Sequence, residues 1–156
     1  MTAETPQSPD QAPDHSAQIA RMVQLFETIT PQNISRLGEF YDPKARFKDP
    51  FNEVVGIPAI GHIFAHMFVQ LTQPHFVVTQ QVLQGQQCFL TWELRFGFKG
   101  FKTSQTQTIL GATHLFLNEA GLITLHRDYW DAAEELYEKL PVVGGLMRWL
   151  KRRASQ

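Results

Sequence analysis

The stretch FYDPKARFKDPF, residues 40–51, contains two Asp-Pro pairs, Asp42-Pro43 and Asp49-Pro50. Proline disfavours a helical conformation in the residue before it and is tolerated at the ends of strands. We therefore expect a short helix to end at Asp42-Pro43. A short strand should then run from Ala45 to Asp49, where Pro50 ends it. Helix and strand signals thus meet within this one stretch, which indicates a mixed fold.

Helical patterns flank this stretch on both sides. Before it, apolar residues recur at spacings of three and four, as on one face of a helix: Ile19, Met22, Val23, Phe26 and Ile29. Thr30-Pro31 has the residue types of a helix start, and a second, short helix should carry Ile34, Leu37 and Phe40 or Tyr41 inward. After the stretch, Gly56 to Pro58 opens a third helix with an apolar side of Ile60, Ile63, Phe64, Met67 and Leu71.

From His75 onward the apolar pattern has a period of two, which is typical of strands. Four segments carry it: His75–Leu83, Cys88–Phe98, Lys102–Leu117 and Leu122–Trp130. Gly85-Gln86, Lys99-Gly100 and Ala120-Gly121 separate them as hairpin turns do. The order predicts an α+β fold in which a curved, mostly antiparallel sheet wraps around the N-terminal helices.

Composition narrows the class of protein. The chain has 156 residues, of which 43% are hydrophobic, 12% aromatic and only 19% charged. A net charge of −1 supplies no field that would attract nucleic acid. The single cysteine, Cys88, excludes an internal disulfide and a Cys-based zinc site. An excess of apolar surface with few charges points to an apolar pocket, a dimer interface or both.

We expect three parts along the chain. Residues 1–14 are rich in proline and polar residues and predict a disordered leader. Residues 15–140 form one domain, and residues 141–156 form a basic amphipathic C-terminal extension. Within the extension, the segment Leu146–Arg153 is compatible with contact with an anionic membrane surface or with packing on the domain. No signal peptide or membrane span is evident, which predicts a cytoplasmic protein.

The element order and two motifs resemble the nuclear transport factor 2-like superfamily. The motifs are residues 40–51, followed by Gly56 and Ile60, and NEAGLI at 118–123 leading into HRDYWD at 126–131. The superfamily includes ketosteroid isomerases, SnoaL-like polyketide cyclases and limonene-epoxide hydrolases. The resemblance implies a cone-shaped roll, a homodimer formed through the outer sheet face, and acid/base chemistry that needs no cofactor or metal.

The resemblance assigns roles to several residues. Asp49 falls where ketosteroid isomerases place their proton-shuttling aspartate. The positions of the isomerase's two oxyanion donors hold Leu25 and Thr113. Leucine donates no hydrogen bond, so steroid isomerisation is not expected.

The run Arg127-Asp128-Tyr129 resembles a run in limonene-epoxide hydrolases, where the aspartate belongs to an Asp–Arg–Asp arrangement that activates water. The partner positions hold Trp92 and Leu94, which cannot serve. SnoaL-like cyclases remain the looser match.

Strand alternation predicts which side chains enter the cone. His126, Asp128 and Trp130 share one face of the last strand, and Leu90, Trp92, Leu94 and Phe96 share one face of the Cys88 strand. We expect Asp49, Asp128 and His126 to be catalytic, with Asp128 and His126 as an acid/base couple. The expected pocket wall comprises Leu25, Phe47, Leu90, Trp92, Leu94, Phe96, Thr113 and Trp130.

Each candidate also has a structural interpretation. Asp49 could cap backbone amides, Asp128 could form a salt bridge, and His126 could be a hydrogen-bonded wall residue. His62 and His66 lie four residues apart on the third helix. We expect them to be solvated or to face the rim of the pocket rather than to bind a metal. The resulting hypothesis is a protein that binds a small hydrophobic molecule and acts as an isomerase, cyclase or hydrolase. The alternative is a non-catalytic ligand-binding or dimeric interaction module.

Overall fold

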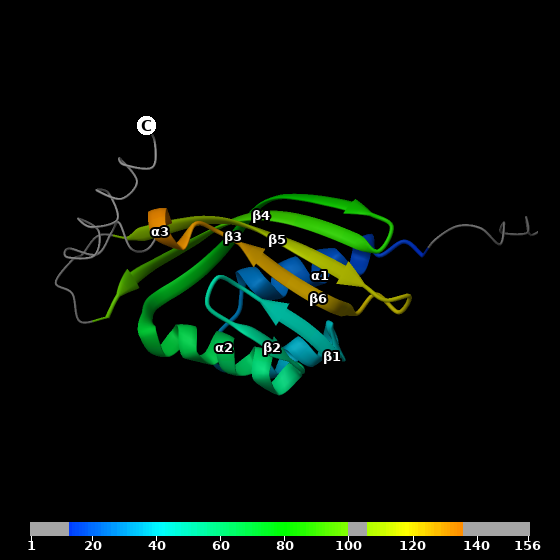
Figure 1. Cartoon of the computed structure of the whole chain (residues 1–156), viewed down its shortest axis with the longest axis horizontal. Coiled ribbons are helices and arrows are strands. Elements are labelled where there is room, and N and C mark those ends of the chain that lie inside the picture. Colours follow the sequence, from blue (N-terminus) through cyan, green and yellow to red (C-terminus); the bar gives the residue numbers. More distant parts are fainter. Residues whose placement is uncertain (1–12, 100–105, 136–156) are drawn as a thin grey trace, which may run out of the picture.

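The structure is a computed structural model that describes residues 13–99 and 106–135 (Figure 1). The helices are α1 (Ser16–Glu27), the 3-10 helix η1 (Ile34–Glu39), α2 (Ile57–Gln70) and α3 (Ala132–Glu135). The strands are β1 (Tyr41–Lys48), β2 (Glu53–Val55), β3 (Leu71–Gln84), β4 (Gln87–Phe98), β5 (Gln107–Leu117) and β6 (Ile123–Tyr129). The predicted C-terminal extension, including Leu146–Arg153, lies outside the described residues, as does most of the predicted leader.

The six strands form one sheet in the order β2-β1-β6-β5-β4-β3. Every neighbouring pair is antiparallel except β1 and β6, which are parallel. Helix α2 contacts β1 and β2 near one edge of the sheet and β3 at the other edge. One helix can contact both edges only because the sheet curves, as Figure 1 shows. The predicted α+β fold with a curved, mostly antiparallel sheet is confirmed.

The hydrophobic core lies between the helices and the inner face of the sheet. Its fully buried members come from every part of the chain and include Leu37, Ala45, Ile60, Cys88 and Leu115. No helix within the described residues is long and apolar enough to span a membrane.

The prediction for the stretch at residues 40–51 is wrong in one respect. Asp42-Pro43 does not end a helix, because η1 already ends at Glu39 and β1 begins at Tyr41. Pairing with β6 extends the strand, and the register shifts between Tyr41 and Arg46. Proline has no N–H for the sheet, so this irregular stretch is where Pro43 can be tolerated.

Two other boundaries also differ from the predictions. The helix expected at Thr30-Pro31 begins only at Ile34, since Asn33 Oδ1 accepts a hydrogen bond from the Thr30 N–H at 2.7 Å. Strand β3 begins at Leu71 directly after α2, before the expected His75. Gln73, with a φ of 48°, lies within a register shift that lets the chain turn there.

Candidate functional site

A cavity of about 680 Å³ lies between α2 and the inner face of the sheet. Of the predicted catalytic residues, Asp49, His126 and Asp128 all line it. The predicted wall residues that line it are Phe47, Leu90, Trp92, Leu94, Phe96, Thr113 and Trp130. Leu25 is the exception, because it is buried in the core, and its neighbour Phe26 faces the cavity instead.

Sheet pairing brings the polar members of the cavity together. Thr113 on β5 lies directly opposite Asp128 on β6, and on its other side it lies opposite Leu90 on β4. His126 lies opposite Leu115 and, across the parallel pair, beside Phe47. Since side chains alternate along a strand, His126 and Asp128 point to the same inner face.

These residues form a continuous chain of hydrogen bonds that runs from the core to the cavity. The Tyr41 hydroxyl contacts His126 Nδ1 at 2.6 Å, and His126 Nε2 contacts Asp128 Oδ1 at 2.8 Å. On the other side, the Trp92 Nε1–H donates to Thr113 Oγ1 at 2.8 Å, and the Thr113 hydroxyl donates to Asp128 Oδ1 at 2.5 Å. Asp128 Oδ1 therefore lies at the centre of a five-residue polar network.

The proton positions in the network follow from the acceptor Asp128. A carboxylate can only accept, so the His126 Nε2 carries the proton that it donates to Oδ1. In a neutral imidazole Nδ1 is then an acceptor, and the Tyr41 hydroxyl donates to it. Burial and, after it, the negative charge of Asp128 raise the pKa of Tyr41 well above its ordinary value of 10.0. Tyr41 thus remains a donor, and every proton in the chain points toward Asp128.

The two oxygens of Asp128 differ in their surroundings. Oδ1 accepts two hydrogen bonds, whereas Oδ2 accepts none from the described residues. The Asp128 side chain is 18% exposed, compared with 4% for His126, so the carboxylate is the more accessible of the two. A carboxylate oxygen that accepts no hydrogen bond within the described residues can take a proton or bind a ligand.

Trp92 occupies its position because residue 111 is a glycine. Gly111 pairs with Trp92 across β4 and β5, and a Cβ there would lie within 3.0 Å of three ring carbons of Trp92. The indole thus lies over the bare backbone of Gly111, with its Nε1–H directed to Thr113.

Asp49 lines the cavity but its carboxylate is engaged in its own turn. Oδ1 accepts from the backbone N–H of Phe51 at 2.7 Å and of Asn52 at 2.6 Å. The Asn52 side-chain amide also donates to both carboxylate oxygens, at 3.1 and 3.0 Å. These contacts are those of an Asx-type turn.

The other titratable candidates lie away from Asp128. His62 and His66 are exposed, stack on each other with ring centroids 6.3 Å apart and line the cavity from α2. No metal-ligating cluster occurs among the residues that the structure describes. Cys88 is buried, and burial raises the pKa of its thiol to about 11.

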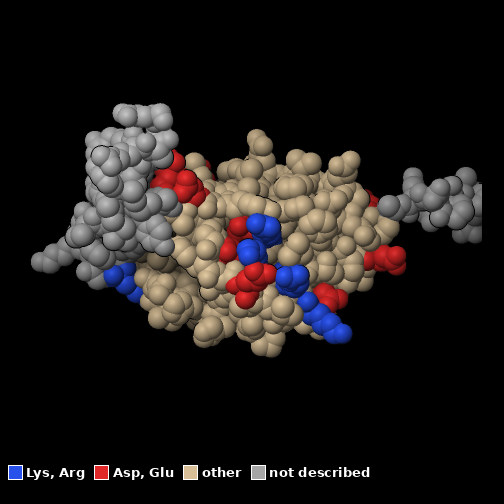
Figure 2. Space-filling model, in the orientation of Figure 1, with Lys and Arg blue, Asp and Glu red and all other residues tan. Residues whose placement is uncertain are grey.

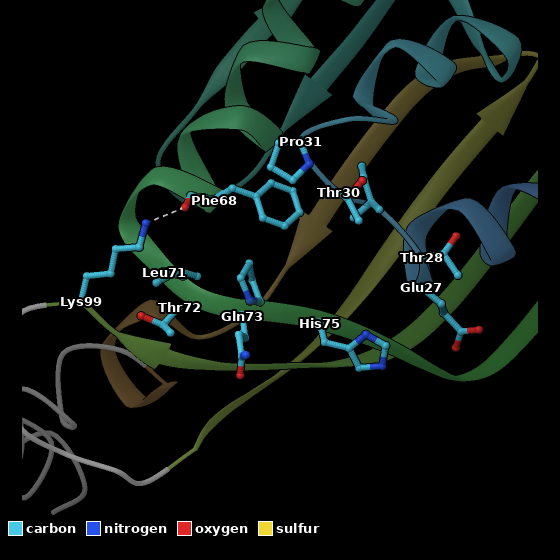
Figure 3. Close-up of a pocket in the computed structure, with 12 residues that line it drawn as sticks. Glu27, Thr28, Thr30, Pro31, Phe68, Leu71, Thr72, Gln73, His75 and Lys99 are labelled. Carbon is cyan, nitrogen blue, oxygen red and sulfur yellow. Dashed lines mark hydrogen bonds between the residues drawn. The ribbon is translucent and has the colours of Figure 1, made fainter.

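A second hollow of about 560 Å³ lies beside the ends of α1 and α2 and the start of β3 (Figure 3). Its two charged side chains both bind backbone groups. Lys99 donates to the Phe68 carbonyl at 2.9 Å, and Glu27 accepts from the Val78 N–H at 2.8 Å. None of the network residues lines this hollow.

On the face seen in Figure 2, side chains of both charges lie close together among wide uncharged areas. Arg46 and Lys48 both pair with Glu53, at N–O distances of 2.8 and 2.6 Å, so charges of both signs also lie side by side on β1 and β2. This face therefore offers no field of a single sign.

Tyr41 and Gly111 are not among the site residues that the sequence predicts. The sequence predicts Tyr41, or its neighbour Phe40, only as an inward residue at the end of a helix. In the structure Tyr41 begins β1, where it is buried on the same face as Ala45 and Phe47. For Gly111 the signal was an isolated glycine within a strand pattern, which indicates close approach of a neighbour.

Comparisons with known proteins bear on the family and the fold. The sequence profile of the SnoaL-like domain matches residues 22–126. A search of curated proteins finds no match.

Three solved structures share the fold at low sequence identity. One is a putative SnoaL-like polyketide cyclase from Jannaschia, with 18% identity, a TM-score of 0.66 and coverage of 84% of this chain and 94% of that one. A hypothetical protein with a ketosteroid isomerase-like fold from Catenulispora acidiphila, solved in complex with trimethylamine, has 17% identity, a TM-score of 0.65 and coverage of 81% and 92%. An LEH-like epoxide hydrolase of M. tuberculosis has 9% identity, a TM-score of 0.63 and coverage of 88% and 91%.

Proposed function

Because the chain belongs to the SnoaL-like domain family, we propose that it binds a small, largely apolar molecule beside Asp128 and catalyses a proton transfer on it. The proposal rests on one observation: Asp128 Oδ1 accepts two hydrogen bonds, while Oδ2, at the cavity, accepts none from the described residues. An isomerase, cyclase or hydrolase-type step is the reaction class.

The roles of the residues follow from the network. Asp128 Oδ2 takes a proton from the ligand as general base and returns it as general acid. The donors on Oδ1, from His126 and Thr113, hold the carboxylate in one orientation and stay in place in both protonation states. His126 and Thr113 are therefore positioning residues, and Tyr41 and Trp92 hold them in turn.

The apolar wall supports a hydrophobic ligand. Aromatic and aliphatic side chains from α2, β3, β4 and β5 surround the polar network, and a cavity of about 680 Å³ is in the range of small-molecule sites. The Catenulispora protein was solved with trimethylamine, and we extend small-molecule binding from it to this chain as part of the proposal.

The test is a ligand panel combined with solvent deuterium exchange. Apolar carbonyl compounds and amines are titrated into the protein by calorimetry, and each ligand that binds is then incubated in D₂O and analysed by NMR. We expect catalysed exchange at one carbon for at least one ligand. Asp128→Asn should lower the exchange rate by about 10²-fold or more, since it removes the base.

Glu93→Gln is the matched control. Glu93 lies on β4 and forms an ion pair with Arg95, and it does not line the cavity. Exchange by Asp128→Asn at the wild-type rate, with every ligand, would contradict the proposal.

A second candidate function is ligand binding without catalysis. It is favoured by the Trp92, Thr113 and His126 donors, which all bond within the network and are therefore not free to stabilise a developing oxyanion. Tight binding without exchange in D₂O would select it.

A further inference from the structure

The charges that line the cavity are unbalanced. Asp49 and Asp128 are both carboxylates, and the cavity-lining residues within the described ranges include no lysine or arginine. Among the described residues that line the cavity, only histidines could become positive. Of these, His126 Nε2 is bound to Asp128 Oδ1, while His62 and His66 are exposed on α2. The described lining therefore carries two carboxylates and no permanently charged cation.

Such a site is unfavourable for anions. A carboxylate or phosphate on a ligand would meet two negative groups with no cation to pair with. The cavity is also unfavourable for a neutral ligand that loses a C–H proton to Asp128, because the ligand would become an anion. The Trp92 and Thr113 donors that could stabilise this anion are already bound within the network. The exposed side chains of His62, His66 and Gln70 on α2 are the other side-chain donors lining the cavity, apart from Asn52, which is bound to Asp49.

The aromatic walls of the cavity favour a positively charged ligand. Phe47 and Trp92 lie on the strands that flank the network, and Phe76 packs edge-on against Trp92 with ring centroids 5.5 Å apart. Trp130 packs edge-on against Phe51 with ring centroids 5.4 Å apart. Aromatic faces attract organic cations, most strongly where water is excluded.

We propose that the ligand carries a cationic nitrogen, as a protonated amine or an iminium, and that Asp128 Oδ2 is its counter-ion. This inference rests on the proposed function and names its substrate class. It follows from three observations taken together: an unpartnered carboxylate oxygen, two carboxylates without a basic residue, and aromatic walls.

The same assignment balances the charge of the proton transfer. In an iminium, the C–H bond next to C=N⁺ breaks, its proton moves to Asp128 Oδ2, and its electron pair forms a C=C bond. The π pair of C=N⁺ moves onto nitrogen. A carboxylate and a cation become a neutral acid and a neutral enamine, so no oxyanion donor is required.

The test uses three probes of matched shape, naphthylmethylamine, naphthylmethanol and naphthoate, titrated into the full chain at neutral pH by calorimetry. We expect the amine to bind at least about tenfold more tightly than the alcohol, and naphthoate more weakly than both. Asp128→Asn should remove the preference for the amine and leave the affinity for the alcohol within about twofold. Glu93→Gln, on the opposite sheet face, should retain all three affinities.

The outcomes separate this inference from the proposed function. If the alcohol binds as tightly as the amine, or if the preference persists in Asp128→Asn, the cationic class is wrong while small-molecule binding stands. If none of the three probes binds, the proposed function and this inference both fail. Near-ultraviolet circular dichroism of Asp128→Asn establishes that the variant is folded before its affinities are compared.

Discussion

The hydroxyl oxygen of Tyr41 lies 2.6 Å from His126 Nδ1, and the two rings are stacked with an interplanar angle of 9°. Tyr41 is 1% exposed and His126 3% exposed, so water cannot replace this contact. On the other side of the ring, His126 Nε2 contacts Asp128 Oδ1 at 2.8 Å, so the two contacts together hold the imidazole in one orientation. A residue that does not line the cavity thus determines the orientation of the one that reaches it.

Tyr41→Phe should destabilise the fold. It leaves His126 Nδ1 as a buried acceptor without a donor, which costs about 1–3 kcal/mol in the free energy of unfolding. Urea denaturation measures the change. Tyr129→Phe is the control, because Tyr129 is 47% exposed on the outer face, and it should change stability by no more than about 0.5 kcal/mol. Equal effects of the two substitutions would refute the role of Tyr41.

Stability should fall at alkaline pH in a way that depends on Tyr41. Its pKa is raised by burial and by Asp128, so above its ordinary value of 10.0 the unfolded chain releases the proton and the folded chain keeps it. The folded state then binds more protons, and stability decreases with each further rise in pH. Below pH 10 both states are protonated and the contribution is complete.

The urea midpoint, followed from about pH 8 to about pH 11, checks this sign. Wild type should lose more stability over the alkaline part of this range than Tyr41→Phe does. The buried thiol of Cys88, with its pKa raised to about 11, is present in both proteins and cancels in the comparison. Parallel curves would rule out the contribution of Tyr41.

Gly111→Ala should displace the Trp92 indole and break its hydrogen bond to Thr113. The new methyl group has no room beside the ring, and overpacking of this kind costs about 1–3 kcal/mol. Near-ultraviolet circular dichroism and urea denaturation report the two effects. Gly38→Ala is the matched control, since nothing lies within 4 Å of its added Cβ and its stability should not fall.

Substitutions at Asp49 separate capping from catalysis. Asp49→Ala removes the acceptor for the Phe51 and Asn52 amides, and a loss of about 1–3 kcal/mol is expected by thermal or urea denaturation. Asp49→Asn keeps an acceptor oxygen and should retain most of the stability. If Asp49 only caps the turn, Asp49→Asn also retains exchange activity; loss of activity without loss of stability would assign it to catalysis.

The outer sheet face is the expected site of homodimer formation. Three apolar side chains on that face are largely exposed to solvent: Val82 (62% exposed), Phe89 (48%) and Leu110 (56%). Exposed apolar patches of this kind are typical of protein–protein interfaces. Sedimentation velocity should show a dimer for wild type and a monomer for Phe89→Glu. Val69→Glu on α2, at a residue 66% exposed, should leave the dimer intact. A monomeric wild type would refute the interface.

Much of the fold was predictable because its signals are local. The alternation of apolar residues in β4 and β6 placed Trp92 and Asp128 on inward faces, and the structure has both beside the cavity. The short strand β2 and the start of β1 were not predictable in this way. Both depend on pairing with distant strands, and the Asp42-Pro43 signal pointed to a helix end that tertiary pairing overrode.

For this protein, sequence by itself determined the fold class and the inward faces of β4 and β6, because a period of two or of 3.6 residues is a property of neighbouring positions. Only the tertiary structure decided which of those side chains bind each other. Tyr41 and His126 are 85 residues apart in the chain, and Trp92 and Thr113 are 21 apart. A hydrogen bond forms only within about 3 Å and in a narrow range of angles. Such a contact is set by the registers of several strands at once, and no local pattern encodes it.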